Sequence, residues 1–314
     1  MKSKKFSIVV PVFNSEETLA LLITRLTEVM QTIASEYEII LVNDGSADNG
    51  WATIQQLASQ DPHLVGIDLM RNYGQHNALL CGIREAQYDV IITIDDDLQN
   101  PPREIPKLIA KLDEGFDVVY GVPVIEQHGF FRDINSQLIK IFLQKAMGVR
   151  IARYVSAFRA FTSISSRAFA EYNGMYVSID VLLSWGTTRF SSVLVDHEPR
   201  THGRSNYSFG KLLTHAFTLV TGFSIIPLRL ASILGFFFVL FGFGVLLYVL
   251  IAYLIHGKSI PGFPFLASII SIFSGVQLFT LGIFGEYLGR IFTRSLDRPS
   301  YTIRSHTTDK ARSS

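Results

Sequence analysis

Apolar runs alternate with segments of helical periodicity through the first 120 residues of the chain. Segments near 16–34, 48–59, 75–87 and 102–114 carry apolar residues at helical spacing. The runs between them are rich in Val and Ile, which is typical of strands. These runs are Phe6–Pro11, Tyr37–Val42, Leu64–Leu69, Asp89–Ile94 and Val118–Tyr120. The alternation predicts an α/β domain with a mostly parallel sheet.

Polar residues follow the first four predicted strands at the point where each strand ends. The sequences there are PVFNSEE, VNDGSADN, LMRNYGQHNA and DDDLQNPP. Taken singly, each is ordinary turn and N-cap chemistry. In a parallel α/β sheet, however, ligands bind at the carboxyl ends of the strands. We therefore expect one composite site built from four strand ends.

Three consecutive acids, Asp95, Asp96 and Asp97, follow the fourth strand. If strand alternation continues through them, Asp95 and Asp97 project to one side and Asp96 to the other. Two carboxylates, with the side-chain carbonyl of Gln99, can bind Mg²⁺ or Mn²⁺, whose shell is completed by water and substrate phosphates. A helix N-cap would account for only one acid, and an EF-hand loop lacks its Gly and distal Glu. The stretch therefore predicts a metal–diphosphate site.

Two uncharged apolar runs follow later in the chain, Leu230–Ile255 and Ile260–Gly285. At ~1.5 Å per residue each run is longer than the ~30 Å hydrocarbon core of a bilayer. We predict transmembrane helices at about 228–255 and 261–288; the alternative is two buried helices of a soluble core. The short connector implies a hairpin, and the Lys and Arg bias of its flanks places the catalytic domain and both termini in the cytoplasm. The expected location is the cytoplasmic membrane.

The residues before the first apolar run, 207–224, place several apolar side chains on one helical face. This pattern predicts an amphipathic helix in the membrane interface, with a packed helix of the soluble domain as the alternative. The expected organisation is a catalytic domain over 1–206, the interfacial helix over 207–224, a hairpin over 225–292 and a cytoplasmic tail over 293–314. The polar end of that tail, SHTTDKARSS, is predicted to be disordered.

Composition narrows the function classes. The formal net charge is +1, so nothing indicates a nucleic-acid partner. The single cysteine, Cys81, excludes an intrachain disulfide and fits a reducing compartment; its apolar neighbours favour a core position. Glycines at 235, 242, 244 and 282 would allow the hairpins to approach closely in a homo-oligomer.

The strand-end motifs SIVVPVFNSEE, VNDGSADN, RNYGQHNA and DDDLQNPP resemble the nucleotide-sugar-binding GT-A fold of family 2 glycosyltransferases, whose acidic motif is called DXD. Further motifs, SAFRAF, RTHGRSNYSF and LGIFGEYLGRI, resemble the polyprenyl-phosphate glycosyltransferases. The two-span bactoprenol glucosyltransferases and aminoarabinose-lipid transferases are the most similar groups, and dolichyl-phosphate mannose synthase is more distant. The resemblance covers nearly the whole chain.

The resemblance implies a transferase that moves a sugar from a nucleoside diphosphate sugar to a polyprenyl phosphate such as undecaprenyl phosphate. UDP-glucose is the favoured donor, with a 4-amino-4-deoxy-arabinose derivative or mannose as the alternative sugar. Expected nucleotide-binding residues are Pro11, Asn14, Glu16, Asp44, Arg71, Asp95 and Asp96. Expected metal ligands are Asp95, Asp97 and Gln99. Expected acceptor-phosphate residues are Arg132, Arg159, Arg200, Arg204 and Ser205, and the residues expected to carry catalysis are Asp97, Arg159 and Arg200.

The acceptor chemistry sets the expected mechanism. A phosphate monoester has a second pKa of ~6 and is largely a dianion at neutral pH, so it can attack the anomeric carbon without a general base. We expect one inverting displacement; Asp180 is the acid that could serve as a base if this is wrong. A processive polysaccharide synthase would carry a Gln-x-x-Arg-Trp motif, which this sequence lacks. A membrane scaffold or lipid-translocating protein with a vestigial nucleotide-binding domain is the alternative of another class.

Overall fold

The computed structural model describes residues 4–124, 155–174, 177–198, 226–256, 262–296 and 298–307. The chain divides into two compact units, one formed by residues 1–206 together with 298–314 and the other by residues 207–297. The predicted interfacial helix at 207–224 lies outside the described residues.

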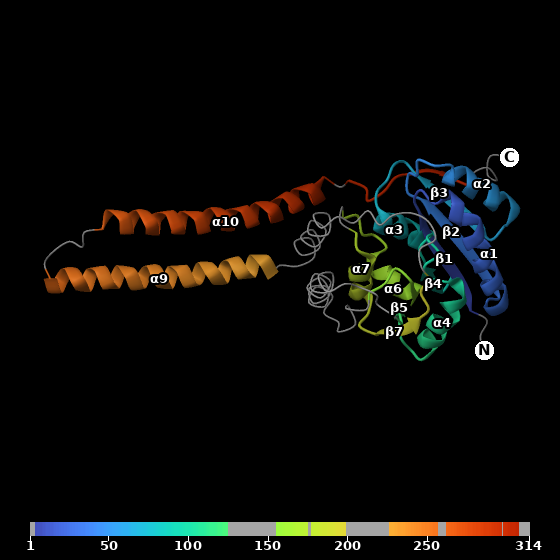
Figure 1. Ribbon diagram of the computed structural model, residues 1–314, viewed down its shortest axis with the longest axis horizontal. Coiled ribbons are helices and arrows are strands. Elements are labelled where there is room, and N and C mark those ends of the chain that lie inside the picture. Colours follow the sequence, from blue (N-terminus) through green and yellow to red (C-terminus); the bar gives the residue numbers. More distant parts are fainter. Residues whose placement is uncertain are drawn as a thin grey trace. The chain divides into compact units, whose positions relative to one another are not determined.

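The first unit is built on an eight-stranded sheet with the order β7-β5-β6-β4-β1-β2-β3-β8 (Figure 1). The pairs β4–β1, β1–β2, β2–β3 and β5–β7 are parallel, whereas β6 and β8 run antiparallel to their neighbours. The strands are β1 (Lys5–Val12), β2 (Glu36–Asn43), β3 (Leu64–Leu69), β4 (Val90–Thr93), β5 (Val118–Pro123), β6 (Arg159–Thr162), β7 (Phe190–Val195) and β8 (Ile303–His306). The predicted α/β fold with a mostly parallel sheet is confirmed.

Helices cover both faces of this sheet. They are α1 (Glu16–Ile33), α2 (Gly50–Gln60), α3 (Gln75–Glu85), η1 (Pro102–Glu104), α4 (Ile105–Asp113), α6 (Ser163–Ser166), η3 (Arg167–Phe169) and α7 (Ile179–Gly186). Alternate residues of β1 divide between the two faces, as a strand requires. Ile8 and Val10 join α1, α2 and α4 in the main core, whereas Val9 meets α3 so closely that a Cβ on Gly82 would lie 2.4 Å from a Val9 methyl group.

The chain returns to this first unit after residue 297. Ile303–His306 form β8, which pairs antiparallel with β3 at the sheet edge, and Thr307 N–H donates to the carbonyl of Gly66 over 3.0 Å. The disorder predicted for the whole polar end is therefore wrong for Ser305–Thr307. A free edge of β3 offers backbone partners that the sequence pattern of the tail does not reveal.

The second unit contains two long helices, α9 (Ile226–His256) and α10 (Phe263–Ser295). Both are long and apolar enough to cross a membrane, over Leu228–Ile255 and Ile272–Ser295. The first range agrees with the predicted span, and the second begins and ends later than the predicted 261–288. Within the unit, Phe273 of α10 packs edge-on against Phe238 of α9 at 5.6 Å between ring centroids. Sidedness stays a prediction.

Candidate active site

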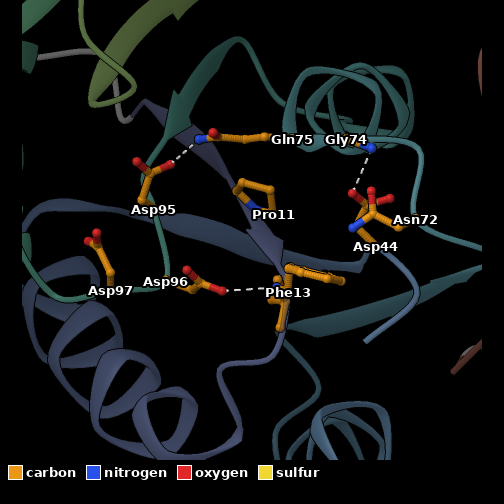
Figure 2. Close-up of a pocket in the computed structure, with 10 residues that line it drawn as sticks. Pro11, Phe13, Asp44, Asn72, Gly74, Gln75, Asp95, Asp96 and Asp97 are labelled. Atoms are coloured by element: carbon orange, nitrogen blue, oxygen red, sulfur yellow. Dashed lines mark hydrogen bonds between the residues drawn. The ribbon is translucent and has the colours of Figure 1, made fainter. Parts of the chain in front are cut away.

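A pocket of about 240 Å³ lies at the carboxyl edge of the central parallel strands (Figure 2). Its walls come from the ends of β1, β2 and β4 and from the loop between β3 and α3, so all four polar strand ends meet there. The lining residues are Pro11, Val12, Phe13, Asp44, Asn72, Gly74, Gln75, Asp95, Asp96 and Asp97. Carboxylates and backbone dominate the opening, as expected of a site for a charged, metal-assisted ligand rather than an apolar one.

The acidic stretch does not continue the strand. β4 ends at Thr93, and Asp95, Asp96 and Asp97 follow in a turn that includes Leu98 at a φ of 62°. The expectation that Asp96 points to the opposite side was wrong in its premise, because side chains alternate only while the backbone is extended. All three aspartates line the pocket.

Asp95 carries the strongest electrostatic perturbation in the pocket. Its carboxylate accepts a hydrogen bond of 2.6 Å from the side-chain amide of Gln75. Burial raises the pKa of Asp95 to about 7, and the like charges of Asp97 and Asp96 add to the rise, against the opposing effect of Arg159. Removal of water and crowding of negative charge both disfavour the ionised carboxylate. A divalent cation bound there would reverse this balance.

Asp96 differs from its neighbours because its carboxylate faces the chain. It accepts hydrogen bonds from the Phe13 N–H, over 3.1 Å, and from the Ser15 hydroxyl, and Figure 2 shows it turned toward Phe13. Its own carbonyl accepts from the Thr18 hydroxyl over 2.7 Å. Asp96 thus ties the acidic turn to the β1–α1 loop, and its predicted contact with nucleotide stays a prediction.

Asp97 keeps a carboxylate oxygen on the pocket side. The Gln99 N–H donates to Asp97 Oδ1 over 3.1 Å, and the Gln99 carbonyl accepts from Glu198 N–H over 2.9 Å. Gln99 does not line the pocket, so its role as a metal ligand stays a prediction. Among the described residues, no group of three or more His, Cys, Asp or Glu is positioned to hold a metal alone. Asp95 and Asp97 suit a cation that takes its other oxygens from phosphates and water.

Asp44 holds two loops together at the other end of the pocket. Its carboxylate accepts from the Tyr73 and Gly74 N–H groups over 2.7 and 2.8 Å. Burial raises the pKa of Asp44, and these two bonds oppose the rise. The next residue, Gly45, has a φ of 64°, and a Cβ there would lie 2.5 Å from the backbone of Arg71. Only glycine allows this close approach.

Asn14 and Glu16 bind the chain rather than line the pocket. Asn14 Oδ1 accepts from the Ala47 N–H over 2.8 Å, and Glu16 Oε2 accepts from the Asn49 N–H over 3.1 Å. These bonds join the β1–α1 loop to the β2–α2 loop. Arg71 is exposed and lies over the ring of Tyr73 at 4.6 Å. The nucleotide contacts predicted for these residues and for Pro11, which lines the pocket, stay predictions.

Arg159, expected to contact the acceptor phosphate, lies on β6 and is 1% exposed. Its guanidinium forms a buried ion pair with Asp180, and its Nε donates to Thr93 Oγ1 over 3.0 Å. The Tyr120 hydroxyl donates to the same oxygen of Asp180 over 3.1 Å. A direct contact between Arg159 and acceptor stays a prediction. The remaining acceptor candidates, Arg132, Arg200, Arg204 and Ser205, lie outside the described residues.

Sequence reasoning missed three contributors to this region. Gln75 belongs to the quoted motif RNYGQHNA, but no role was assigned to it although it is the hydrogen-bond donor to Asp95. Tyr120 ends an apolar run and gave no signal of its bond to Asp180. Asn72 lines the pocket beside Gly74 and could have been found because it lies at a strand end.

The sheet and its acidic edge define a GT-A type α/β domain. Residues 7–171 match the model of glycosyl transferase family 2, and the chain belongs to that family. Solved structures of glucosyl-3-phosphoglycerate synthase from Mycobacterium tuberculosis share the fold. The complex with phosphoglyceric acid is 16% identical with a TM-score of 0.52, and the comparison covers 69% of this chain and 78% of that one. The complex with Mn²⁺, UDP and phosphoglyceric acid is 17% identical with a TM-score of 0.51, covering 69% and 76%.

The raised pKa of Asp95 predicts a dependence of stability on pH. An unperturbed Asp has a pKa of 3.8, and that of Asp95 is about 7, so between these values the folded protein holds a proton that the unfolded chain has released. The contribution of this group to the free energy of unfolding is therefore full at low pH and lost as the pH rises through 7. In chelator, Asp95→Asn should melt at a higher temperature than wild type at pH 8 and at the same temperature near pH 4. Equal melting temperatures at pH 8 would contradict this.

Proposed function

We propose that this protein is a membrane-bound, inverting glycosyltransferase that moves a sugar from a nucleoside diphosphate sugar to a polyprenyl phosphate. The observation that carries the proposal is a pocket with three aspartates at the strand ends of a family 2 domain, in a chain that also contains two apolar helices of membrane-spanning length. The favoured donor is UDP-glucose and the favoured acceptor is undecaprenyl phosphate.

The donor assignment is supported by the chemistry of the pocket. Asp95 and Asp97 offer hard oxygen ligands for Mg²⁺ or Mn²⁺, which in turn suits a diphosphate. A bound cation would neutralise charge on the departing nucleoside diphosphate. The family 2 fold is shared with structures described as complexes with Mn²⁺ and UDP-glucose or with Mg²⁺ and UDP. UDP-glucose is therefore the first donor to test.

The acceptor assignment is supported by the apolar helices and by the state of Asp180. Helices able to lie in a bilayer would keep the transferase where a lipid phosphate is available. Asp180 is committed to Arg159 and Tyr120, which argues against its use as a general base. A phosphate dianion needs no base. Its oxygen forms the new bond to the anomeric carbon as the bond to the diphosphate breaks, with inversion.

The test uses the full chain in detergent or lipid nanodiscs, with radiolabelled UDP-glucose, undecaprenyl phosphate and Mg²⁺ or Mn²⁺. We expect a labelled lipid product and UDP release that depends on the lipid phosphate and stops in excess chelator. Replacing the lipid with 3-phosphoglycerate should give no product. Turnover that persists in chelator would refute the metal role, and UDP release without lipid would refute the acceptor.

A panel of donors separates the remaining possibilities. Incubation with UDP- and GDP-sugars in turn should give product with one sugar, and product from an aminoarabinose or mannose donor alone would replace glucose in the proposal. If no donor releases nucleoside diphosphate in the presence of polyprenyl phosphate, the scaffold or lipid-translocation alternative gains support, because a vestigial domain would have no turnover.

A further inference from the structure

The residues that follow the two apolar helices, 298–307, contribute to the donor pocket although none of them lines it. We call them the return segment, because the chain comes back through them to the catalytic unit and adds β8 to the sheet edge. We call Met70–Gly74, which connects β3 to α3, the donor loop, because its Asn72 and Gly74 line the pocket. The contacts between these two segments are specific.

Arg304 is the main contact of the return segment with the sheet edge. Its Nη1 lies 3.3 Å from a carboxylate oxygen of Asp68, the second-last residue of β3, whose side chain is 3% exposed. The other carboxylate oxygen accepts from the Asn43 side-chain amide over 2.7 Å. Asp68 and Asn43 are register partners on β3 and β2. Arg304 thus supplies the positive charge for a buried carboxylate at the start of the donor loop.

The return segment also fixes the donor loop directly. Met70 N–H donates to the Thr302 carbonyl over 2.9 Å, and Arg304 Nη2 donates to the Met70 carbonyl over 2.8 Å. Both backbone groups of Met70 are therefore held. Further along the loop, Tyr73 is hydrogen bonded to the Thr302 side chain, and this contact lowers the pKa of the Tyr73 hydroxyl.

The opposite side of the donor loop is fixed by β2. Tyr73 and Gly74 donate their N–H groups to Asp44, and the backbone of Arg71 and Asn72 lies against Gly45. The loop therefore lies between two supports, the Asp44–Gly45 turn on one side and the return segment on the other. The ring of Tyr73 in turn carries the guanidinium of Arg71. Loss of either support would change where Arg71 and Asn72 present their polar groups.

We propose that Arg304 and Thr302 are positioning residues of the donor site, which hold the donor loop in the conformation that binds the nucleoside diphosphate. The nucleotide affinity of the catalytic unit then depends on a segment that lies beyond the apolar helices in sequence. Describing the ligand as a nucleoside diphosphate rests on the proposed function. The positioning itself rests on the contacts of Met70, Tyr73 and Asp68.

The test compares Arg304→Ala with Arg298→Ala in the full chain. Arg298 lies in the same segment, is exposed, and has no printed ion pair within the described part of the chain, so the control makes the same substitution without the contacts. For Arg304→Ala we expect the KM for UDP-glucose to rise about tenfold, which corresponds to about 1.4 kcal/mol, with kcat changed by less than about twofold. Arg298→Ala should match wild type. Unchanged KM in Arg304→Ala would overturn the proposal.

A second readout works without turnover. Hydrogen exchange of a peptide covering 70–74 reports the Tyr73 and Gly74 N–H groups that donate to Asp44. We expect faster exchange in Arg304→Ala than in wild type or Arg298→Ala. If wild type turns over no donor, the proposed function fails while this measurement still decides the positioning. Unchanged exchange at 70–74, even with a lower melting temperature, would show that Arg304 only stabilises the sheet edge.

Two milder variants separate the contacts. Arg304→Lys keeps the charge near Asp68 but cannot hold both Asp68 and the Met70 carbonyl with a planar fork, so its KM should lie between wild type and Arg304→Ala. Thr302→Val removes the hydroxyl that contacts Tyr73 and keeps the backbone carbonyl that accepts from Met70. It should raise the KM less than Arg304→Ala does. A KM in Arg304→Lys equal to that of Arg304→Ala would assign the effect to the fork rather than to the charge.

Discussion

Asp97→Asn should lower kcat by at least about 100-fold while the protein keeps its fold and its membrane insertion. The fold is expected to survive because the amide of Asn can still accept the Gln99 N–H bond that Asp97 Oδ1 accepts now. The activity is expected to fall because one of two carboxylates available to a divalent cation loses its charge. Initial rates at several Mn²⁺ concentrations, with circular dichroism and melting temperature alongside, measure both parts.

Two variants control this prediction. Asp113→Asn removes a carboxylate that forms a surface ion pair with Lys4 on the far strand end, and it should leave the rate unchanged. Asp96→Asn removes the same charge one residue away, at a side chain that bonds to the Phe13 N–H and the Ser15 hydroxyl. We expect Asp96→Asn to cost less activity than Asp97→Asn. A rate for Asp97→Asn within about threefold of wild type would remove this residue from the metal site.

The central sheet could be predicted because its signal is local. β1, β2 and β3 are uninterrupted apolar runs bounded by turn residues, and their observed limits fall within two residues of the predicted ones. The pocket could be predicted in outline for the same reason, since parallel strands bring their carboxyl ends to one edge whatever the details of the loops. Asp44 and Asp95 meet there as a consequence of topology.

The roles within the acidic stretch could not be predicted from alternation. The strand period holds only as far as Thr93, and the positive φ of Leu98 marks a turn that the sequence does not announce. The direction of Asp96 is set by the Phe13 N–H, which belongs to a loop 83 residues earlier. A contact of that separation depends on the assembled fold rather than on local sequence.

β8 was missed for a related reason. Ile303–His306 contain one apolar residue in four, which is too little for a strand pattern. The strand forms because β3 has an unpaired edge and because Arg304 meets the buried Asp68, a residue 236 positions away. Polar tails beyond membrane-length helices therefore cannot be assigned to disorder from composition alone.

Asp180→Ala should lower the free energy of unfolding by about 3–5 kcal/mol, the largest stability effect that we expect from a single substitution in the catalytic unit. Arg159 is 1% exposed, and the carboxylate of Asp180 is its charged partner, with the Tyr120 hydroxyl on the same oxygen. Removal of Asp180 would leave a guanidinium buried without a counter-charge. Denaturant or thermal unfolding of the full chain in detergent measures the loss.

The matched variants separate charge burial from lost packing. Tyr120→Phe removes one neutral donor and should cost only about 1 kcal/mol. The double substitution Arg159→Met with Asp180→Leu removes both charges and should recover most of the stability lost in Asp180→Ala. If the double variant is as unstable as Asp180→Ala, the pair acts through shape rather than charge. If it is stable but inactive, Arg159 is needed for turnover beyond its structural pairing, because its positive charge also opposes the raised pKa of Asp95.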